Sequence, residues 1–131
     1  MTYPALGEGV PTFEQLESEY GTATDELCQA HESIIESILE EEEQLISKHR
    51  SHIDEVVSVV KEEMSLLNDV DKPGSDVEQY VELLDATLLK KIQVITQFRS
   101  KLLNFHKHLK TEEQMSKLYQ RNQELAASVE I

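Results

Sequence analysis

The sequence is 131 residues long and carries 26 acidic against 12 basic residues, a formal charge of −14 at pH 7. Its 4 glycines and 3 prolines are too few for the many turns of a β-sandwich or barrel. Its Leu, Ile and Val residues exceed what a disordered acidic tail contains. An all-α protein of one domain, or of one extended element, is therefore predicted.

Composition also excludes several classes of location and partner. The single cysteine, Cys28, cannot form an internal disulfide, which is typical of a reducing compartment. No apolar run approaches the roughly 18 residues that a membrane span requires, and the N-terminus lacks the features of a signal peptide. The acidic charge disfavours nucleic acid as a partner, because phosphates repel it. We expect a cytoplasmic protein that binds neither membrane nor nucleic acid.

Residues 1–24 are expected to be a flexible leader that contains one short helix. Thr12 followed three positions later by Gln15 is a capping-box pattern, which predicts a helix over 13–20. Gly21 then interrupts the helical pattern.

A long helix is predicted over residues 25–68, where neither glycine nor proline occurs. Thr22 or Thr24 is the candidate cap at its start. Apolar residues recur there at steps of seven without a break, and neighbouring apolar positions widen the stripe beyond a narrow two-helix seam. The row consists of Leu39, Ile46, Ile53, Val60 and Leu67.

A turn is predicted over residues 69–75, followed by a second long helix over 76–126. Pro73-Gly74 fits the two central positions of a type II turn, and Ser75 with Glu78 forms a second capping box. The second helix carries its own row at steps of seven, Val81, Leu88, Ile95, Leu102 and Leu109, with Val77, Leu84, Phe98 and Phe105 at the alternate position.

The charge distribution agrees with a reversal at this turn. Residues 1–71 contain 18 acids and 3 bases, whereas six bases and no acid lie between residues 90 and 110. A reversal about residues 71–72 sets Glu40–Glu43 beside Lys101 and Arg99, and such exposed pairs favour the antiparallel direction.

The fold predicted over residues 25–126 is therefore a long antiparallel helical hairpin or coiled coil. Two helices alone hide little of so wide an apolar stripe, so we expect homodimerisation into a bundle, or docking on a partner. The expected core of the hairpin or dimer is Leu39, Ile46, Ile53, Val60, Leu67, Val81, Leu88, Ile95, Phe98, Leu102, Phe105 and Leu109.

No pattern in the sequence indicates catalysis, a cofactor or a metal. The glycines lack the clustering of a phosphate-binding loop. His49 and His52 share a helical face, but no third metal ligand is evident, so two surface or seam histidines are the favoured interpretation. Four consecutive glutamates, Glu40–Glu43, point around the whole helix and cannot converge on one ion. Cys28 is best interpreted as a small seam residue.

The basic stretch of the second helix is the candidate partner-binding patch. It fits docking of an acidic protein partner, and it equally fits neutralisation of the acidic first helix. The patch consists of Lys90, Lys91, Arg99, Lys101, Lys107 and Lys110.

Motifs in a fixed order resemble the C-terminal, non-motor region of kinesin-13 motors, over about residues 36 to 116. They are a Glu-rich entry from Leu39 to His49-Arg50, the run Lys-Glu-Glu-Met-Ser-Leu-Leu ending at Leu67, and Asp-Lys-Pro-Gly-Ser ending at Ser75. Kinesin-13 proteins use ATP to depolymerise microtubule ends through a motor domain, and this chain has no phosphate-binding loop. The resemblance implies a non-catalytic, microtubule-associated region that dimerises and contacts the motor or cytoskeletal and spindle proteins.

The alternative is a freestanding acidic coiled-coil adaptor. In this interpretation the basic second helix recruits an effector protein, and no motor precedes the chain. The open reading frame distinguishes the two hypotheses.

Overall fold

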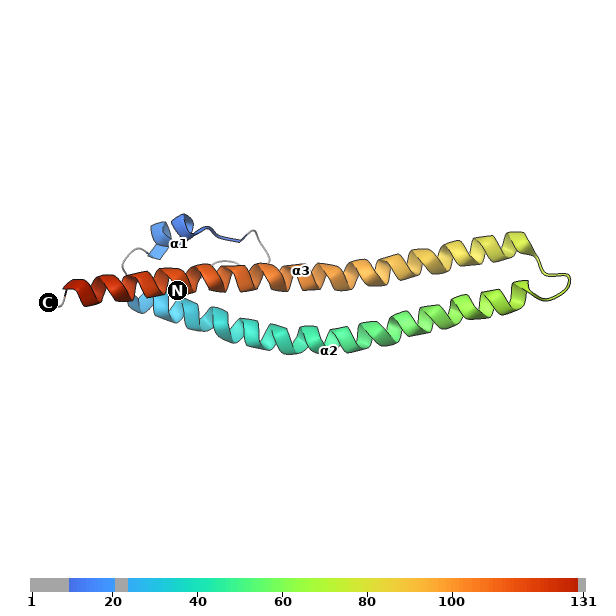
Figure 1. The fold of residues 1–131 in the computed structure, drawn as a ribbon, viewed down its shortest axis with the longest axis horizontal. Coiled ribbons are helices and arrows are strands. Elements are labelled where there is room, and N and C mark those ends of the chain that lie inside the picture. The colour runs from blue at the N-terminus through green and yellow to red at the C-terminus, as the bar shows by residue number, and fades with distance from the viewer. Residues whose placement is uncertain (1–9, 21–23, 130–131) are drawn as a thin grey trace. The chain divides into compact units, whose positions relative to one another are not determined.

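A computed structural model describes residues 10–20 and 24–129, and within these ranges the elements are all helices. They are α1 (Phe13–Tyr20), α2 (Thr24–Val70) and α3 (Val77–Val129). The predicted all-α class is confirmed, and α2 and α3 form a helical hairpin (Figure 1). Most of the expected leader, and the candidate cap Thr22, lie outside the described residues.

The start of α1 has the reciprocal hydrogen bonds of a capping box. The backbone N–H of Thr12 donates to Gln15 Oε1 at 2.8 Å, and the N–H of Gln15 donates to Thr12 Oγ1 at 3.1 Å. Each bond satisfies a backbone donor that the first helical turn leaves without a partner. Local sequence therefore determines where this short helix begins.

The turn between α2 and α3 has the predicted type II geometry. The N–H of Ser75 donates to the carbonyl oxygen of Lys72 at 3.2 Å, which closes a four-residue turn with Pro73 and Gly74 at its centre. Gly74 has a φ of 75°, a value that residues with a Cβ rarely adopt. Pro73 has its own φ fixed by its ring at the value that the position before Gly74 requires, so both residues suit this turn.

The cap of α3 differs from the one that the sequence predicted. Asp76, not Ser75, caps the helix: its Oδ1 accepts a hydrogen bond from the N–H of Gln79 at 3.1 Å. Ser75 Oγ instead donates to the carbonyl oxygen of Val70 at 2.7 Å, so it satisfies the end of α2. A carboxylate at the cap gains additionally from the positive end of the helix dipole, which favours Asp76.

The chain divides into two compact units, and each is described by itself. Unit 1 comprises Met1–Gln44 with Leu102–Ile131, and unit 2 comprises Leu45–Lys101. Segments of α2 and α3 contribute to each unit, and α1 belongs to unit 1.

Unit 1 has the larger apolar core, because three helices contribute to it. Leu16 of α1 is 1% exposed and packs in one cluster with residues of α2 and α3. The spacing of the α2 members, at steps of three and four, places them on one helical face. The other buried members are Leu27, Ala30, Ile34, Ile38, Met115 and Leu118.

Charged side chains join the helices around this core. Arg121 of α3 pairs with Glu17 of α1, and its guanidinium carbon lies 5.2 Å from the centroid of the Phe13 ring, within cation–π range. His108 Nδ1 is paired with a carboxylate oxygen of Glu41 in a largely buried position. These contacts hold α1 against α3 and α2 against α3.

The pairing of Glu41 with His108 corrects the predicted register. The sequence set Glu40–Glu43 beside Lys101 and Arg99, on the assumption that the chain reverses about residues 71–72. The turn instead fills the interval between Val70 and Val77, which is centred on Pro73-Gly74. This later centre sets Glu41 opposite a higher-numbered residue of α3 than the predicted register did.

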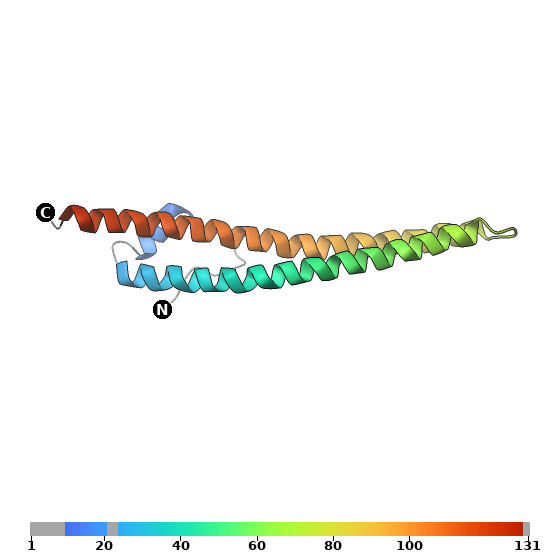
Figure 2. The ribbon, with the colours of Figure 1, turned by 60° about the horizontal axis from the view of Figure 1, so that its bottom comes forward.

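In unit 2, α2 and α3 lie side by side and antiparallel, as Figures 1 and 2 both show. Their least exposed side chains follow the two rows of a heptad, which we denote d and a. The d row contains Leu45, His52, Val59 and Leu66 of α2 with Tyr80, Thr87 and Val94 of α3. The a row contains Val56, Glu63 and Val70 of α2 with Leu84, Lys91 and Phe98 of α3.

The seam of unit 2 combines a few apolar contacts with polar ones. Val59, 2% exposed, is its most deeply buried large side chain. The rings of His49 and His52 both stack on Phe98, with centroid distances of 5.2 and 4.7 Å. The interpretation of these histidines as seam residues agrees with this arrangement.

Candidate functional site: an apolar face on unit 2

The apolar row that dominates the sequence is exposed in unit 2. Val60 and its equivalents follow the d position directly, at position e of the heptad. Their exposed fractions run from 38% for Val60 to 57% for Val81. The e row consists of Ile46, Ile53, Val60 and Leu67 of α2 and Val81, Leu88 and Ile95 of α3.

The expected core is therefore corrected as far as the hairpin itself is concerned. Phe98 and Phe105 are partly buried against the opposite helix, as a-row residues. The other ten expected core residues are 38–57% exposed, and Leu39, Leu102 and Leu109 of unit 1 are among them. Their place in an interface between copies stays a prediction.

The residues that form the hairpin seam explain why the sequence indicated the e row instead. The d row contains His52, Thr87 and the exposed Lys101, so a count of apolar residues favours the neighbouring e row. The structure shows that the hairpin uses the more polar of the two rows. The more apolar row is left on the surface, where it contacts solvent in the single chain.

The e rows of α2 and α3 lie on the same side of unit 2. In an antiparallel helix pair, the e positions of the two helices lie on one side of the seam. The g positions of the two helices lie together on the opposite side. The pair between Lys90 Nζ and Glu62 Oε1, at 3.0 Å, joins two g positions and so marks that opposite side. One side of unit 2 is thus apolar across both helices.

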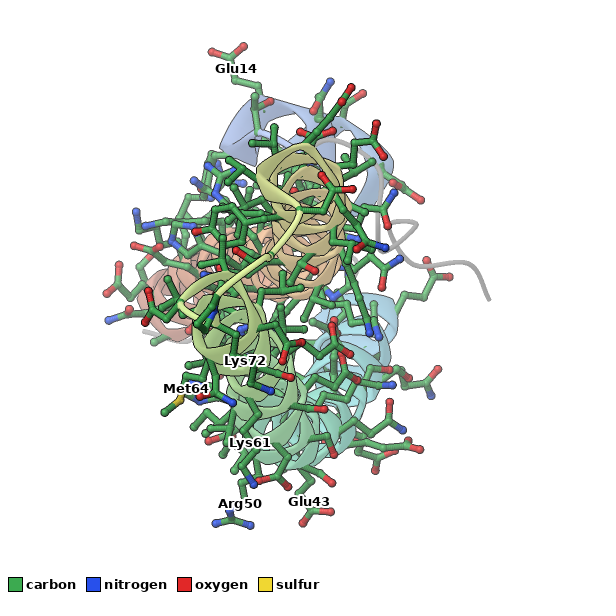
Figure 3. The ribbon with its side chains drawn as sticks, turned by 90° about the vertical axis from the view of Figure 1, so that its right-hand side faces the viewer. Glu14, Glu43, Arg50, Lys61, Met64 and Lys72 are labelled. Carbon is green, nitrogen blue, oxygen red and sulfur yellow. The ribbon has the colours of Figure 1, made fainter. Side chains whose placement is uncertain are left out.

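Three exposed residues at b positions, Val57, Met64 and Ile92, widen this side. Figure 3 shows Met64 projecting from the flank of α2, and Arg50 extending from α2 on the side away from α3. We call the e-row residues of unit 2 together with these three b residues the apolar face. Contiguous apolar surface of this kind is typical of association sites.

The opposite side of unit 2 is polar and contains a small hollow. This hollow of about 160 Å³ is lined by residues that include Lys48, Ser51, His52 and Lys101. The nearby ammonium of Lys48 lowers the pKa of Lys101, because like charges disfavour protonation. Within the described residues, Ser51 and His52 share no hydrogen bond, and the ring of His52 stacks on Phe98.

The structure divides the predicted basic patch into paired and unpaired cations. Lys90 pairs with Glu62, and Lys91 Nζ lies 2.9 Å from Glu63 Oε2 inside the seam. Lys110 pairs with Glu113 on its own helix, at 3.3 Å. Among the described residues, Arg99 and Lys107 make no ion pair, and Lys101 meets Lys48. Half of the patch therefore neutralises acids of this chain.

Within the described ranges, no three His, Cys, Asp or Glu side chains are grouped so as to hold a metal ion. No described helix is apolar over a stretch long enough to cross a membrane.

Comparison with known proteins identifies relatives over part of the chain. KIN-13A, a kinesin-like protein of Oryza sativa subsp. japonica, is 41% identical over 83 residues, which are 63% of this chain and 10% of that protein. KIN-13B, a kinesin-like protein of Arabidopsis thaliana, is 36% identical over 76 residues, 58% of this chain and 11% of that protein. No family model matches the chain, and no solved structure matches it.

The chain thus spans about a tenth of the length of the curated relatives that it matches. Its described elements are all helices, and the chain is not a motor domain. These matches confirm the resemblance: the chain is similar in sequence to a short region of these kinesin-13 proteins.

Proposed function

We propose that the chain is a non-catalytic association region of a kinesin-13-like, microtubule-associated motor protein. It joins two copies through the apolar face, and the joined region contacts the motor or cytoskeletal partners and so regulates or localises the motor. The similarity to KIN-13 proteins supports the family assignment. The exposed apolar face supports the association role, because a single hairpin leaves these apolar side chains in contact with solvent.

The size of the apolar face supports association between copies. Its ten side chains are each 38–62% exposed, so together they present on the order of 800 Å² of surface. A standard stable interface buries about 800 Å² on each partner. Leaving so many Ile, Leu and Val side chains in water forgoes about 25 cal/mol for each Å² of apolar surface. Covering the face is therefore strongly favourable.

Sedimentation equilibrium of the purified chain tests this proposal. We expect a dimer, and we expect Val60→Glu at the centre of the face to give a monomer with unchanged helical circular dichroism. Ser58→Glu is the matched control, because it adds the same charge at an exposed α2 position outside the face. A monomeric parent chain, or equal effects of both substitutions, contradicts the proposal.

A second experiment tests the regulatory role in the parent motor protein. Deletion of residues 36–116 is expected to alter self-association or targeting of the parent protein. The ATPase activity of its motor is expected to persist. Unchanged association and unchanged targeting would contradict the proposed role.

The structure weakens the alternative of an adaptor that docks its effector on the basic second helix. Lys90, Lys91 and Lys110 are paired with Glu62, Glu63 and Glu113 of this chain. A partner would have to displace these acids, so the basic stretch offers fewer free cations than the sequence indicates.

A further inference from the structure

Charged residues border the apolar face unevenly along unit 2. Arg50 and Arg99 occupy b positions of α2 and α3, on the edges of the face. Glu78 and Asp85 occupy b positions of α3 nearer the turn, and Asp71 directly follows α2. All five are exposed, and none forms an ion pair with another described residue.

The hairpin contacts determine which of these charges lie level with one another. Phe98 stacks on the rings of two α2 histidines, so the adjacent Arg99 lies level with Arg50. Glu78 lies in the first turn of α3, level with Asp71 at the end of α2. The face therefore has two cations at one end and acids at the end near the turn.

We propose that two copies pack apolar face against apolar face with their hairpins antiparallel, about a two-fold axis near Val60. This inference rests on the proposed self-association and specifies its geometry. In this arrangement α2 lies opposite the partner's α2 and α3 opposite the partner's α3. Arg50 then approaches Asp71 of the partner subunit, and Arg99 approaches Glu78 of the partner subunit.

The parallel arrangement of two hairpins brings like charges together. Its two-fold axis runs along the helices and sets α2 opposite the partner's α3. Arg50 then faces Arg99 of the partner subunit, and Asp71 faces Glu78 of the partner subunit, because these residues are level. Like charges across an interface select against the partner geometry that creates them. Both arrangements bury the same apolar rows, so charge decides the direction.

The apolar residues fit the antiparallel arrangement as well. Val60 lies midway between the level of Arg50 and that of Asp71, which is where the two-fold axis passes. Val57 and Ile92, which lie level with each other about one helical turn from this axis, are 45% and 59% exposed and carry no charge. On the other side of the axis, Asp85 lies level with Met64 at the edge of the face. The other four charges lie farther from the axis, so most of the charge lies toward the ends of the interface, as is usual in protein interfaces.

Cysteine cross-linking in the full chain tests the direction of packing. In a Cys28→Ser background, Val60→Cys is expected to form an intermolecular disulfide under mild oxidation, because it faces its own copy at the axis. Lys72→Cys in the turn is the matched variant. Antiparallel packing separates the two turns by about 35 Å, so this variant is expected not to cross-link. Parallel packing places the turns side by side.

Charge reversal gives a second test, in which the two arrangements differ in sign. Arg99→Glu is expected to weaken the dimer about three- to tenfold in Kd at low salt, since it adds an acid beside Glu78 of the partner subunit. Adding Glu78→Arg to the same chain is expected to restore the affinity. In parallel packing, Arg99→Glu strengthens the dimer instead. Lys61→Glu, an equal charge change at the exposed position f of α2, outside the apolar face, is the control.

The outcomes separate the orientation from the association itself. A chain that sediments as a monomer overturns both the proposed function and this inference. A dimer in which Lys72→Cys cross-links, or in which Arg99→Glu tightens association, leaves the proposed function standing and overturns the antiparallel geometry. Cross-linking of Val60→Cys alone, with restoration by the double charge reversal, is the expected result.

Discussion

Two adjacent valines offer the sharpest test of the register in unit 2. Val59, 2% exposed, lies in the hairpin seam, and Val60, 38% exposed, lies in the e row. The two side chains share chemistry, helix and sequence neighbourhood. They differ only in direction, so truncating each to alanine compares seam with surface.

The expected magnitudes follow from burial. Removing two methyl groups from Val59 forfeits about 1.6 kcal/mol of burial free energy, and an incompletely filled cavity adds to this. Alanine returns about 0.5 kcal/mol through its higher helix propensity. We therefore expect Val59→Ala to lower the free energy of unfolding by about 1.5–2.5 kcal/mol. Val60→Ala is expected to cost about 0.5 kcal/mol or less in the dissociated chain.

Urea unfolding followed by circular dichroism measures both values, at a dilute and at a high protein concentration. The cost of Val60→Ala is expected to rise by about 1 kcal/mol at the high concentration, where the apolar face is covered, because association stabilises the folded chain. The cost of Val59→Ala is expected to stay the same. An equal cost of the two substitutions in dilute solution would refute the assignment of the seam.

Three further predictions concern other contacts. Glu63→Lys is expected to destabilise unit 2, and adding Lys91→Glu is expected to recover about 1 kcal/mol, measured as the coupling energy of a double-mutant cycle. Leu16→Ala removes a buried side chain at a cost of about 2–5 kcal/mol, more than an isolated helix of 8 residues can offset; faster amide exchange over residues 13–20 with unchanged exchange over 45–101 is expected. The ammonium of Lys110 lowers the pKa of Glu113, so this carboxylate stabilises the fold at neutral pH and loses that effect as acidification protonates it; Lys110→Gln is expected to raise the pKa of Glu113 in an NMR titration.

The sequence predicted those features of the fold that depend on local chemistry. Thr12 with Gln15 marks the first residue of α1, and Pro73-Gly74 marks the turn, because capping and positive φ depend on nearby residues alone. The exchange of roles between Ser75 and Asp76 was not predictable from the pattern. Both residue types cap helices, and only the path of the turn decides which side chain reaches which helix end.

The seam was harder to predict, because periodicity alone does not determine which of two adjacent rows faces the partner helix. The e row, which contains Val60, is uniformly apolar, whereas the d row, which contains Val59, also includes the polar residues His52 and Thr87. Stacking of His52 on Phe98 makes that polar residue a seam contact, and no count of apolar residues detects such a contact. The burial of Leu16 of α1 against α2 and α3 was missed for a similar reason, since it depends on three helices meeting.

The polar contacts of the seam and the apolar e row suit different tasks. An apolar seam with a strict heptad buries nearly the same surface when one helix slips by seven residues, so it determines register weakly. The pair between Glu63 and Lys91, and the stack of two histidines on Phe98, form in one register only. They stabilise little, because partly exposed ion pairs contribute about 0–1 kcal/mol, but they select the alignment of α2 and α3. That alignment sets the two e rows level on one side of unit 2. The hairpin thus uses its polar residues to define its own structure, and it leaves its most apolar residues available for association.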